Sequence, residues 1–249
     1  MDLELSGKRA WVSGGSRGIG KAIALELARE GVRVAISGRT AADLQTAAQE
    51  INAATGYRPV AARGDTRSPG DVDGMADQIG RELGGIDILV NCAAKPGGYV
   101  HKLQDGAHEL LGQDLDTKVL GYLRCIEAVA PGMQTAGWGR IVNIGGLAAR
   151  NSASLSGMRN LALVHLSKTL SDQLGPSGVT VNAVHPGATR TELPGEEDSR
   201  RRTADNAIGR IVDAQEIAWL VAFLCSPKAG AITGESIGAG GGVGQAVFA

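Results

Sequence analysis

Short apolar runs alternate with amphipathic stretches along nearly the whole chain. The runs are rich in Val, Ile, Leu and Ala, whereas the stretches between them repeat apolar residues at helical spacing, as Ile19, Ile23 and Leu27 do. The pattern predicts strands at 9–12, 32–37, 58–63, 86–90, 141–144, 179–184 and 232–237. It predicts helices between them, at 19–29, 40–53, 72–83, 106–130, 161–174 and 217–224.

This alternation predicts an α/β fold: a single-domain, Rossmann-type, doubly wound parallel sheet of about seven strands with helices on both faces. The run 86–90 is apolar almost throughout, which is typical of a central strand covered on both sides. The 249 residues fit one domain, 1–249, and no repeat or linker divides them. The polar segment 193–206 is expected to be a mobile lid over the substrate mouth or a plain surface loop.

A glycine-rich turn joins the first predicted strand to the first predicted helix. Gly14 permits a tight turn, Gly18 lets the backbone approach a ligand, and Gly20 lets the helix pack closely on the strand. The first N–H groups of the helix lack partners within it and can bind a pyrophosphate. In this strand–turn–helix setting the glycines predict a dinucleotide site; a plain glycine-rich turn is the alternative.

Two arginines decide which dinucleotide we expect. An NAD-preferring site places a carboxylate at the end of the second strand, where this chain has Gly38 followed by Arg39. Arg17 lies in the glycine turn and faces the same pocket. Two guanidiniums suit a 2′-phosphate, so we predict NADP (NADPH), with NAD less favoured. Alternatively, Arg39 only begins a polar loop.

The spacing Gly-x-x-x-Gly-x-Gly at 14–20, preceded by Ser13, resembles that of the short-chain dehydrogenase/reductase family. Segment 91–94 partly matches the family's Asn-Asn-Ala-Gly, and 186–191 matches its Pro-Gly-x-x-x-Thr turn. The resemblance implies that Asp65 bonds the adenine, although Asp65 could equally cap a turn. Together with the glycine turn, it implies this cofactor-binding set: Gly14, Ser16, Arg17, Gly18, Ile19, Gly20, Arg39, Asp65, Thr66, Asn91, Ala93, Asn160, Pro186, Gly187, Thr189 and Thr191.

The proton-transfer positions of that family carry different residues here. Where the family has Tyr, Lys, Ser and Asn, this chain aligns Ser156, Asn160, Gly146 and Lys118. An aliphatic hydroxyl is shorter than a tyrosine and a much weaker acid. Lys118, Ser156 and Asn160 are therefore the catalytic candidates, because a partly desolvated lysine could titrate near neutrality. A solvated helix lysine is the alternative for Lys118.

Three functions stay open from these residues. The first is an oxidoreductase acting on a small carbonyl or alcohol with a relocated proton donor, for which Lys95, Tyr99 and His101 on the 95–104 loop are further candidates. The second is non-redox chemistry such as hydration, elimination or carbon–carbon cleavage. The third is a catalytically silent NADP-binding protein. We expect His185 to be structural and His165 to be packed in the core.

Composition excludes some partners. A net charge of -1 and a pI near 6.4 give no basic surface for nucleic acid, and no apolar run reaches the ~20 residues of a membrane span. The acidic N-terminus is unlike a signal peptide, so we expect a cytoplasmic protein. Cys92, Cys125 and Cys225 lack metal-ligand spacing, which predicts reduced thiols and no metal. The family resemblance implies a homodimer or homotetramer.

Overall fold

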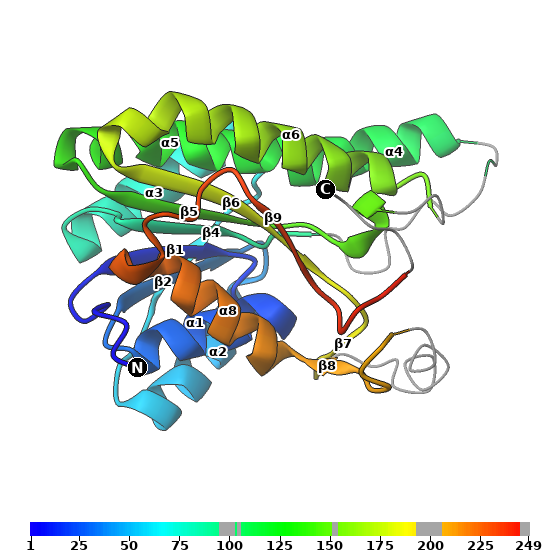
Figure 1. The fold of residues 1–249 in the computed structure, drawn as a ribbon. Coiled ribbons are helices and arrows are strands. Elements are labelled where there is room, and N and C mark those ends of the chain that lie inside the picture. Colours follow the sequence, from blue (N-terminus) through cyan, green and yellow to red (C-terminus); the bar gives the residue numbers. More distant parts are fainter. Residues whose placement is uncertain (95–102, 104–105, 151–153, 193–205, 245–249) are drawn as a thin grey trace.

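A parallel sheet forms the centre of the computed structural model, which describes residues 1–94, 103, 106–150, 154–192 and 206–244 (Figure 1). Its strands are β1 (Arg9–Ser13), β2 (Arg33–Gly38), β3 (Val60–Arg63), β4 (Ile88–Asn91), β5 (Gly139–Ile144), β6 (Val179–Pro186) and β9 (Ser236–Ala239). Their order is β3-β2-β1-β4-β5-β6-β9, with every neighbouring pair parallel. This confirms the predicted doubly wound sheet. Strand order reverses between β1 and β4, and ligands bind at such a reversal.

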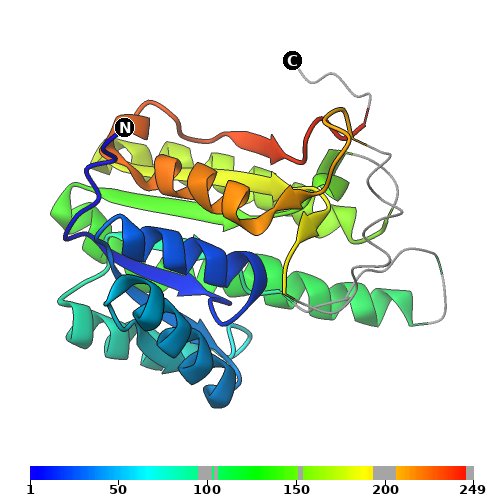
Figure 2. The ribbon, with the colours of Figure 1, turned by 90° about the horizontal axis from the view of Figure 1, so that it is seen from below.

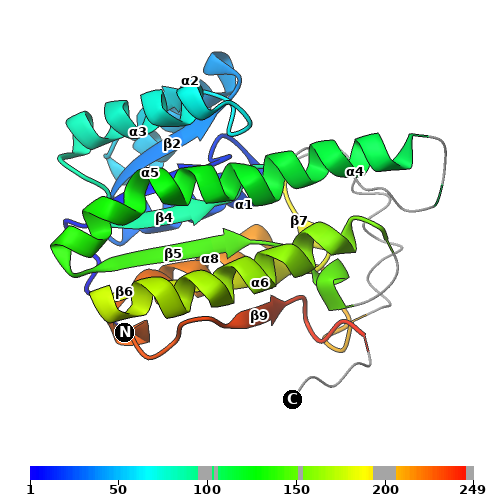
Figure 3. The ribbon, with the colours of Figure 1, turned by 90° about the horizontal axis from the view of Figure 1, so that it is seen from above.

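Helices cover both faces of the sheet. The elements are α1 (Gly18–Arg29), α2 (Ala41–Thr55), α3 (Pro69–Leu83), α4 (Ala107–Leu115), α5 (Gly121–Ala136), α6 (Gly157–Leu174) and α8 (Ala214–Cys225). Helices α1, α2 and α8 lie below the sheet in Figure 1, and α3, α5 and α6 lie above it. Figure 2 shows α8 (orange) beside α1 (blue), whereas Figure 3 shows α4 and α5 following one line beside α6.

The pleat of the strands divides the core between the two faces. Ala10 and Val12 of β1 join the cluster under α1, α2 and α8, whereas Trp11 joins the cluster under α3 and α5. All three side chains are fully buried. Successive strand residues point to opposite faces, so a strand covered on both sides needs apolar residues at every position. The apolar strand runs therefore reflect this two-sided burial.

The long helix predicted at 106–130 is continuous but not uniform. It consists of α4, a π turn at Asp116–Leu120 and α5, which continues to Ala136 and ends at left-handed Gly137. A π turn inserts a residue into the helical repeat and turns the following side chains to a new direction; such turns are frequent at functional sites. This one carries Lys118.

Several predicted details are wrong. Helix α3 begins at Pro69 rather than at residue 72, and the Ser68 hydroxyl caps it by accepting the Asp71 N–H at 3.3 Å. Helix α6 begins at Gly157 rather than at residue 161, and His165 on it is exposed instead of packed in the core. A small second sheet of β7 (Thr189–Arg190) and β8 (Val212–Asp213) was not predicted.

The predicted lid and loop fall largely outside the described residues. Residues 193–205 of the lid lie outside the described part of the chain, and so do Lys95, Tyr99 and His101 of the loop. Within the described ranges, none of the helices is both long enough and apolar enough to cross a bilayer.

Candidate functional site

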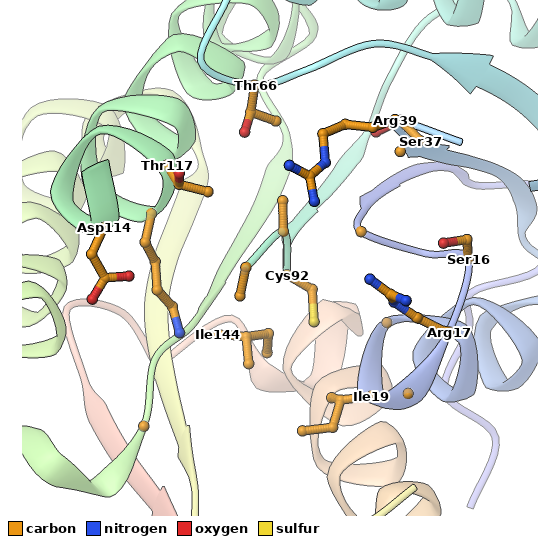
Figure 4. A pocket seen from close by; sticks show the side chains of 18 of the residues that line it. Ser16, Arg17, Ile19, Ser37, Arg39, Thr66, Cys92, Asp114, Thr117 and Ile144 are labelled. Carbon is orange, nitrogen blue, oxygen red and sulfur yellow. The ribbon is translucent and has the colours of Figure 1, made fainter. Parts of the chain in front are cut away.

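A cleft of about 920 Å³ opens at the carboxyl ends of the central strands. The glycine turn and the end of β2 line one side, and α4, the π turn and α6 line the other. Figure 4 shows this division: Ser16, Arg17 and Arg39 approach from one side, and Asp114 and Thr117 lie opposite. The cleft therefore has two differently built halves, which we call the dinucleotide half (lined by 14–20, 37–40 and 64–67) and the α4–α6 half (lined by Asp114, Thr117, Lys118, Gly145, Gly146 and Arg159).

Segments of backbone lie very close to one another in the dinucleotide half. Gly14 has a φ of 67°, and a Cβ there would lie 2.8 Å from the Cα of Ala93. A Cβ on Gly20 would overlap the carbonyl oxygen of Gly14. The turn thus needs glycine at both positions for steric reasons. All the predicted cofactor-binding residues of this stretch line the cleft: Gly14, Ser16, Arg17, Gly18, Ile19 and Gly20.

A carboxylate lies at the N-terminus of α1. Glu192 accepts the N–H of Gly18 at 2.9 Å and pairs with Lys21 at 3.1 Å. Burial opposes the charge on Glu192, but the Gly18 hydrogen bond and Lys21 outweigh it and lower the pKa of this carboxyl. The helix end thus stabilises an anion, as its unpaired N–H groups and dipole predict. The sequence analysis did not single out Glu192.

The two arginines of the dinucleotide half are exposed and line the cleft. Figure 4 shows both guanidiniums extending into the opening. Neither makes a side-chain hydrogen bond or ion pair with another described residue. Asp65, by contrast, is paired with Arg67 at 2.7 Å, and this hydrogen-bonded partner lowers the pKa of the Asp65 carboxyl despite its partial burial. Thr66 is buried beside it and also lines the cleft.

Asn91 has a different environment from the one predicted. Its side chain is fully buried, and its amide donates to Asn143 Oδ1 at 3.0 Å across the β4–β5 pair. It is not among the residues that line the cleft, although the predicted cofactor-binding set includes it. The next residues, Cys92 and Ala93, do line it. Burial raises the pKa of the Cys92 thiol to about 11, and Lys118 partly counteracts this.

The turn after β6 forms the floor of the cleft. Pro186, Gly187, Thr189 and Thr191 all line it. His185 lies behind this turn, fully buried, where its Nδ1 is 3.1 Å from both the N and the O of Gly146. The ring thus fixes the backbone after β5, which is the structural role expected for it.

Lys118 is the central cation of the α4–α6 half. Only 5 % of it is exposed, and its Nζ donates to the carbonyl of Gly145 at 2.9 Å. Burial and, after it, the nearby Arg159 lower the pKa of Lys118 to about 7, against the smaller opposing effects of Cys92 and Asp114. The structure therefore excludes the alternative of a solvated helix lysine. An amine with this pKa can give or accept a proton near neutral pH.

A buried ion pair joins α4 to α6 next to Lys118. The Arg159 guanidinium bonds Oδ1 of Asp114, and both side chains are under 5 % exposed. This pair was not predicted, because it joins residues 45 positions apart on two different helices and no local spacing indicates it.

Ser156 and Asn160 do not reach the cleft. Both are at most 1 % exposed and neither lines it, so the predicted contact of either side chain with substrate or ribose is absent from this arrangement. The Asn160 amide finds no hydrogen-bond partner among the described residues. A Cβ on Gly146 would lie 3.1 Å from its Nδ2, so Gly146 separates Asn160 from the opening.

Comparison with known proteins agrees with this architecture. A family model described as enoyl-(acyl carrier protein) reductase matches residues 14–244. The chain belongs to the short-chain dehydrogenase/reductase family. It is 35 % identical to the short-chain reductase protein NovJ of Streptomyces niveus, over 94 % of this chain and 92 % of NovJ. It is 34 % identical to the 3-oxoacyl-[acyl-carrier-protein] reductase FabG of Vibrio cholerae, over 97 % and 99 % of the two chains.

A solved family member shows the same fold in a complex. L-sorbose reductase from Gluconobacter frateurii, complexed with NADPH and L-sorbose, superposes with a TM-score of 0.89 at 26 % identity, covering 99 % of this chain and all of that one. The relatives are reductases, so the family assignment supports an oxidoreductase.

Proposed function

We propose that this short-chain dehydrogenase/reductase is an NADP(H)-dependent oxidoreductase of a small carbonyl or alcohol, with Lys118 as a non-standard proton donor. The single observation that carries the proposal is the position of Lys118: a buried amine with a pKa of about 7 that lines the cleft. Lys118 is also the only buried lysine among the described residues.

The dinucleotide half fits NADP. The glycines of its turn leave space against the backbone that a Cβ would fill. Arg17 and Arg39 offer two guanidiniums for a 2′-phosphate. The NADPH complex of the sorbose reductase supports the same cofactor. We propose contacts from the lining members of the predicted set, and exclude only the side chains of Asn91 and Asn160, which are buried away from the cleft.

The α4–α6 half would supply or accept the proton. The bound dinucleotide would supply or accept a hydride. Lys118 would give a proton to the carbonyl oxygen of the substrate, or remove one from an alcohol. A positioned acid of matched pKa contributes about 10²–10⁴-fold to such a step. We propose that Ser156 and Asn160 support Gly146 from beneath and do not touch the substrate.

Two further parts of the proposal concern the whole molecule. Large apolar side chains are exposed on α4, the π turn and α6, at Leu110, Leu120, Met158 and Leu161. Contact between subunits would bury this exposed apolar surface, which supports the proposal of a homodimer or homotetramer. The three free cysteines support a cytoplasmic location, and we keep 193–206 as a proposed lid.

The test is NADPH oxidation against a panel of small aldehydes and ketones, with wild type and Lys118→Met. We expect turnover by wild type and a loss of about 10²–10⁴-fold in the variant. Lys168→Met, at an exposed lysine, serves as the matched control and should retain full activity. Tight NADPH binding without turnover in either protein would instead indicate a silent binding protein, and product without a change in cofactor absorbance would indicate non-redox chemistry.

A further inference from the structure

We propose that Lys118 also captures small aldehydes and ketones covalently, as a protonated imine, in a reaction that needs no dinucleotide. The inference goes beyond the proposed reductase, because the amine acts here as a nucleophile instead of a proton donor. It rests on three features of the α4–α6 half: the burial of Lys118, the neighbouring Asp114–Arg159 pair, and the open backbone opposite them.

The surroundings of Lys118 keep its amine reactive. The side chain is buried, and its Nζ has one hydrogen-bond partner among the described residues, the carbonyl of Gly145. Donation of one N–H to that carbonyl leaves the lone pair of a neutral amine unused. The charged and titratable groups around it are Arg159 on α6, Asp114 on α4 and Cys92 after β4. Desolvation and a nearby cation are the two means by which proteins make a lysine nucleophilic.

The ion pair supplies the proton acceptor. Arg159 uses Oδ1 of Asp114, whereas the buried Oδ2 has no hydrogen-bond partner within the described part of the chain. Asp114 lines the cleft together with Lys118. Figure 4 shows its carboxylate on the same side of the cleft as Thr117, the residue that precedes Lys118. Asp114 and Lys118 make no direct hydrogen bond or ion pair among the described residues, so a proton would pass from the attacking amine to this carboxylate, and on to the oxygen of the carbonyl compound, through water in the cleft.

Space for a carbonyl compound lies against Gly145 and Gly146, which line the cleft without side chains. Two buried side chains support this backbone from behind: Asn160, whose amide a Cβ on Gly146 would approach to 3.1 Å, and His185, whose Nδ1 is 3.1 Å from the N and the O of Gly146. A small aldehyde or ketone can therefore approach Nζ along bare backbone.

The reaction balances without an oxidant or reductant. The lone pair of Nζ forms a bond to the carbonyl carbon as the π pair of the C=O bond moves to oxygen, and the proton that nitrogen loses passes by way of Asp114 to that oxygen to give a carbinolamine. A second proton, from solvent, converts the hydroxyl to water; the C–O bond breaks as the nitrogen lone pair forms the C=N bond, and a protonated imine remains. Water reverses each step, so the adduct stays in equilibrium with free carbonyl compound.

Reductive trapping tests the inference. Full-length protein without NADP(H) is incubated at pH 7 with acetaldehyde or pyruvate and sodium cyanoborohydride, and peptide mass mapping then locates the secondary amines. We expect Lys118 to be labelled at least about tenfold faster than Lys168, an exposed lysine paired with Asp172. Labelling of Lys118 should reach half its maximum near pH 7, because Arg159 and burial outweigh Asp114 and Cys92.

Lys118→Arg keeps the cation but removes the nucleophile, and should abolish the cleft adduct while surface labelling continues. Asp114→Asn should slow labelling of Lys118 alone. Equal labelling of Lys118 and Lys168 in wild type, which needs no variant to fold, would overturn the inference. An adduct without NADPH oxidation would sustain it while the reductase proposal fails, and NADPH oxidation without an adduct would do the reverse.

Discussion

The two halves of the cleft differ in what they are made of. The dinucleotide half is built from backbone, with exposed arginines at its rim, whereas the α4–α6 half is built from three buried charges, Asp114, Lys118 and Arg159. Exposed charges cost little to place and contribute little to folding. Buried charges are costly and persist only when paired or neutralised. We therefore expect substitutions of the exposed arginines in the dinucleotide half to leave the free energy of unfolding almost unchanged. Substitutions of the buried charges in the α4–α6 half should change it.

The largest expected effect tests that coupling at the ion pair. Arg159→Leu leaves the Asp114 carboxylate buried and unpaired, so we expect a loss of about 3–5 kcal/mol in the free energy of unfolding, measured in urea. Arg39→Ala, in the dinucleotide half, should change it by no more than about 0.5 kcal/mol. The double variant Asp114→Leu/Arg159→Leu should lose less than Arg159→Leu alone. Equal losses in the two halves would remove the distinction.

A smaller effect is expected from the buried amine, with a definite pH dependence. Folding lowers the pKa of Lys118 from 10.5 to about 7, so the folded state disfavours the ammonium form. The resulting penalty is absent above the unfolded pKa, grows as the pH falls and is complete below the folded pKa. Lys118→Met should therefore raise the free energy of unfolding by about 2–4 kcal/mol at pH 6 and by little near pH 11. A gain that does not vary with pH would show that Lys118 is not desolvated.

The dinucleotide half should respond in binding and not in stability. Arg39→Ala removes one charged donor for a 2′-phosphate, so we expect the Kd for NADPH to rise about 10–100-fold, measured by titration calorimetry. The Kd for NADH should not change. Arg58→Ala provides a surface control, since Arg58 bonds Gln45 outside the cleft. Equal affinity for NADH and NADPH in wild type would contradict the phosphate assignment.

The smallest effect concerns Glu192 at the start of α1. Its carboxylate holds the N–H of Gly18, which a bound phosphate would also attract. Glu192→Gln keeps an acceptor but removes the charge, and we expect NADPH to bind about 2–5-fold more tightly at low salt. Added salt should shrink the difference. Glu50→Gln, at the other partner of Lys21, is the matched control; an equal gain there would show that only net charge matters.

How much of the site could be predicted varied with the range of the interactions. The glycine turn was predictable because adjacent residues determine its backbone. Lys118 could be predicted as a candidate because it stands where the family has Asn. Its burial could not be predicted, since that depends on the π turn and on the approach of α6. Asn91 was assigned to the wrong environment because its amide bonds Asn143, 52 residues away. Ser156 and Asn160 both lie before the predicted helix 161–174, whereas in the structure Asn160 is on α6 and its amide lies behind Gly146.

Neighbouring residues alone specify the doubly wound sheet and the glycine turn with its two arginines, because these follow from hydrophobic period and local backbone geometry. The meeting of Asp114 with Arg159, the burial of Lys118 beside them and the approach of Glu192 to the start of α1 depend on how distant segments pack together. These contacts join residues 45, 41 and 174 positions apart, for Asp114–Arg159, Lys118–Arg159 and Gly18–Glu192 respectively. Charge–charge interactions over such separations follow from how helices pack against the sheet, and the local pattern of apolar and polar residues does not encode that packing.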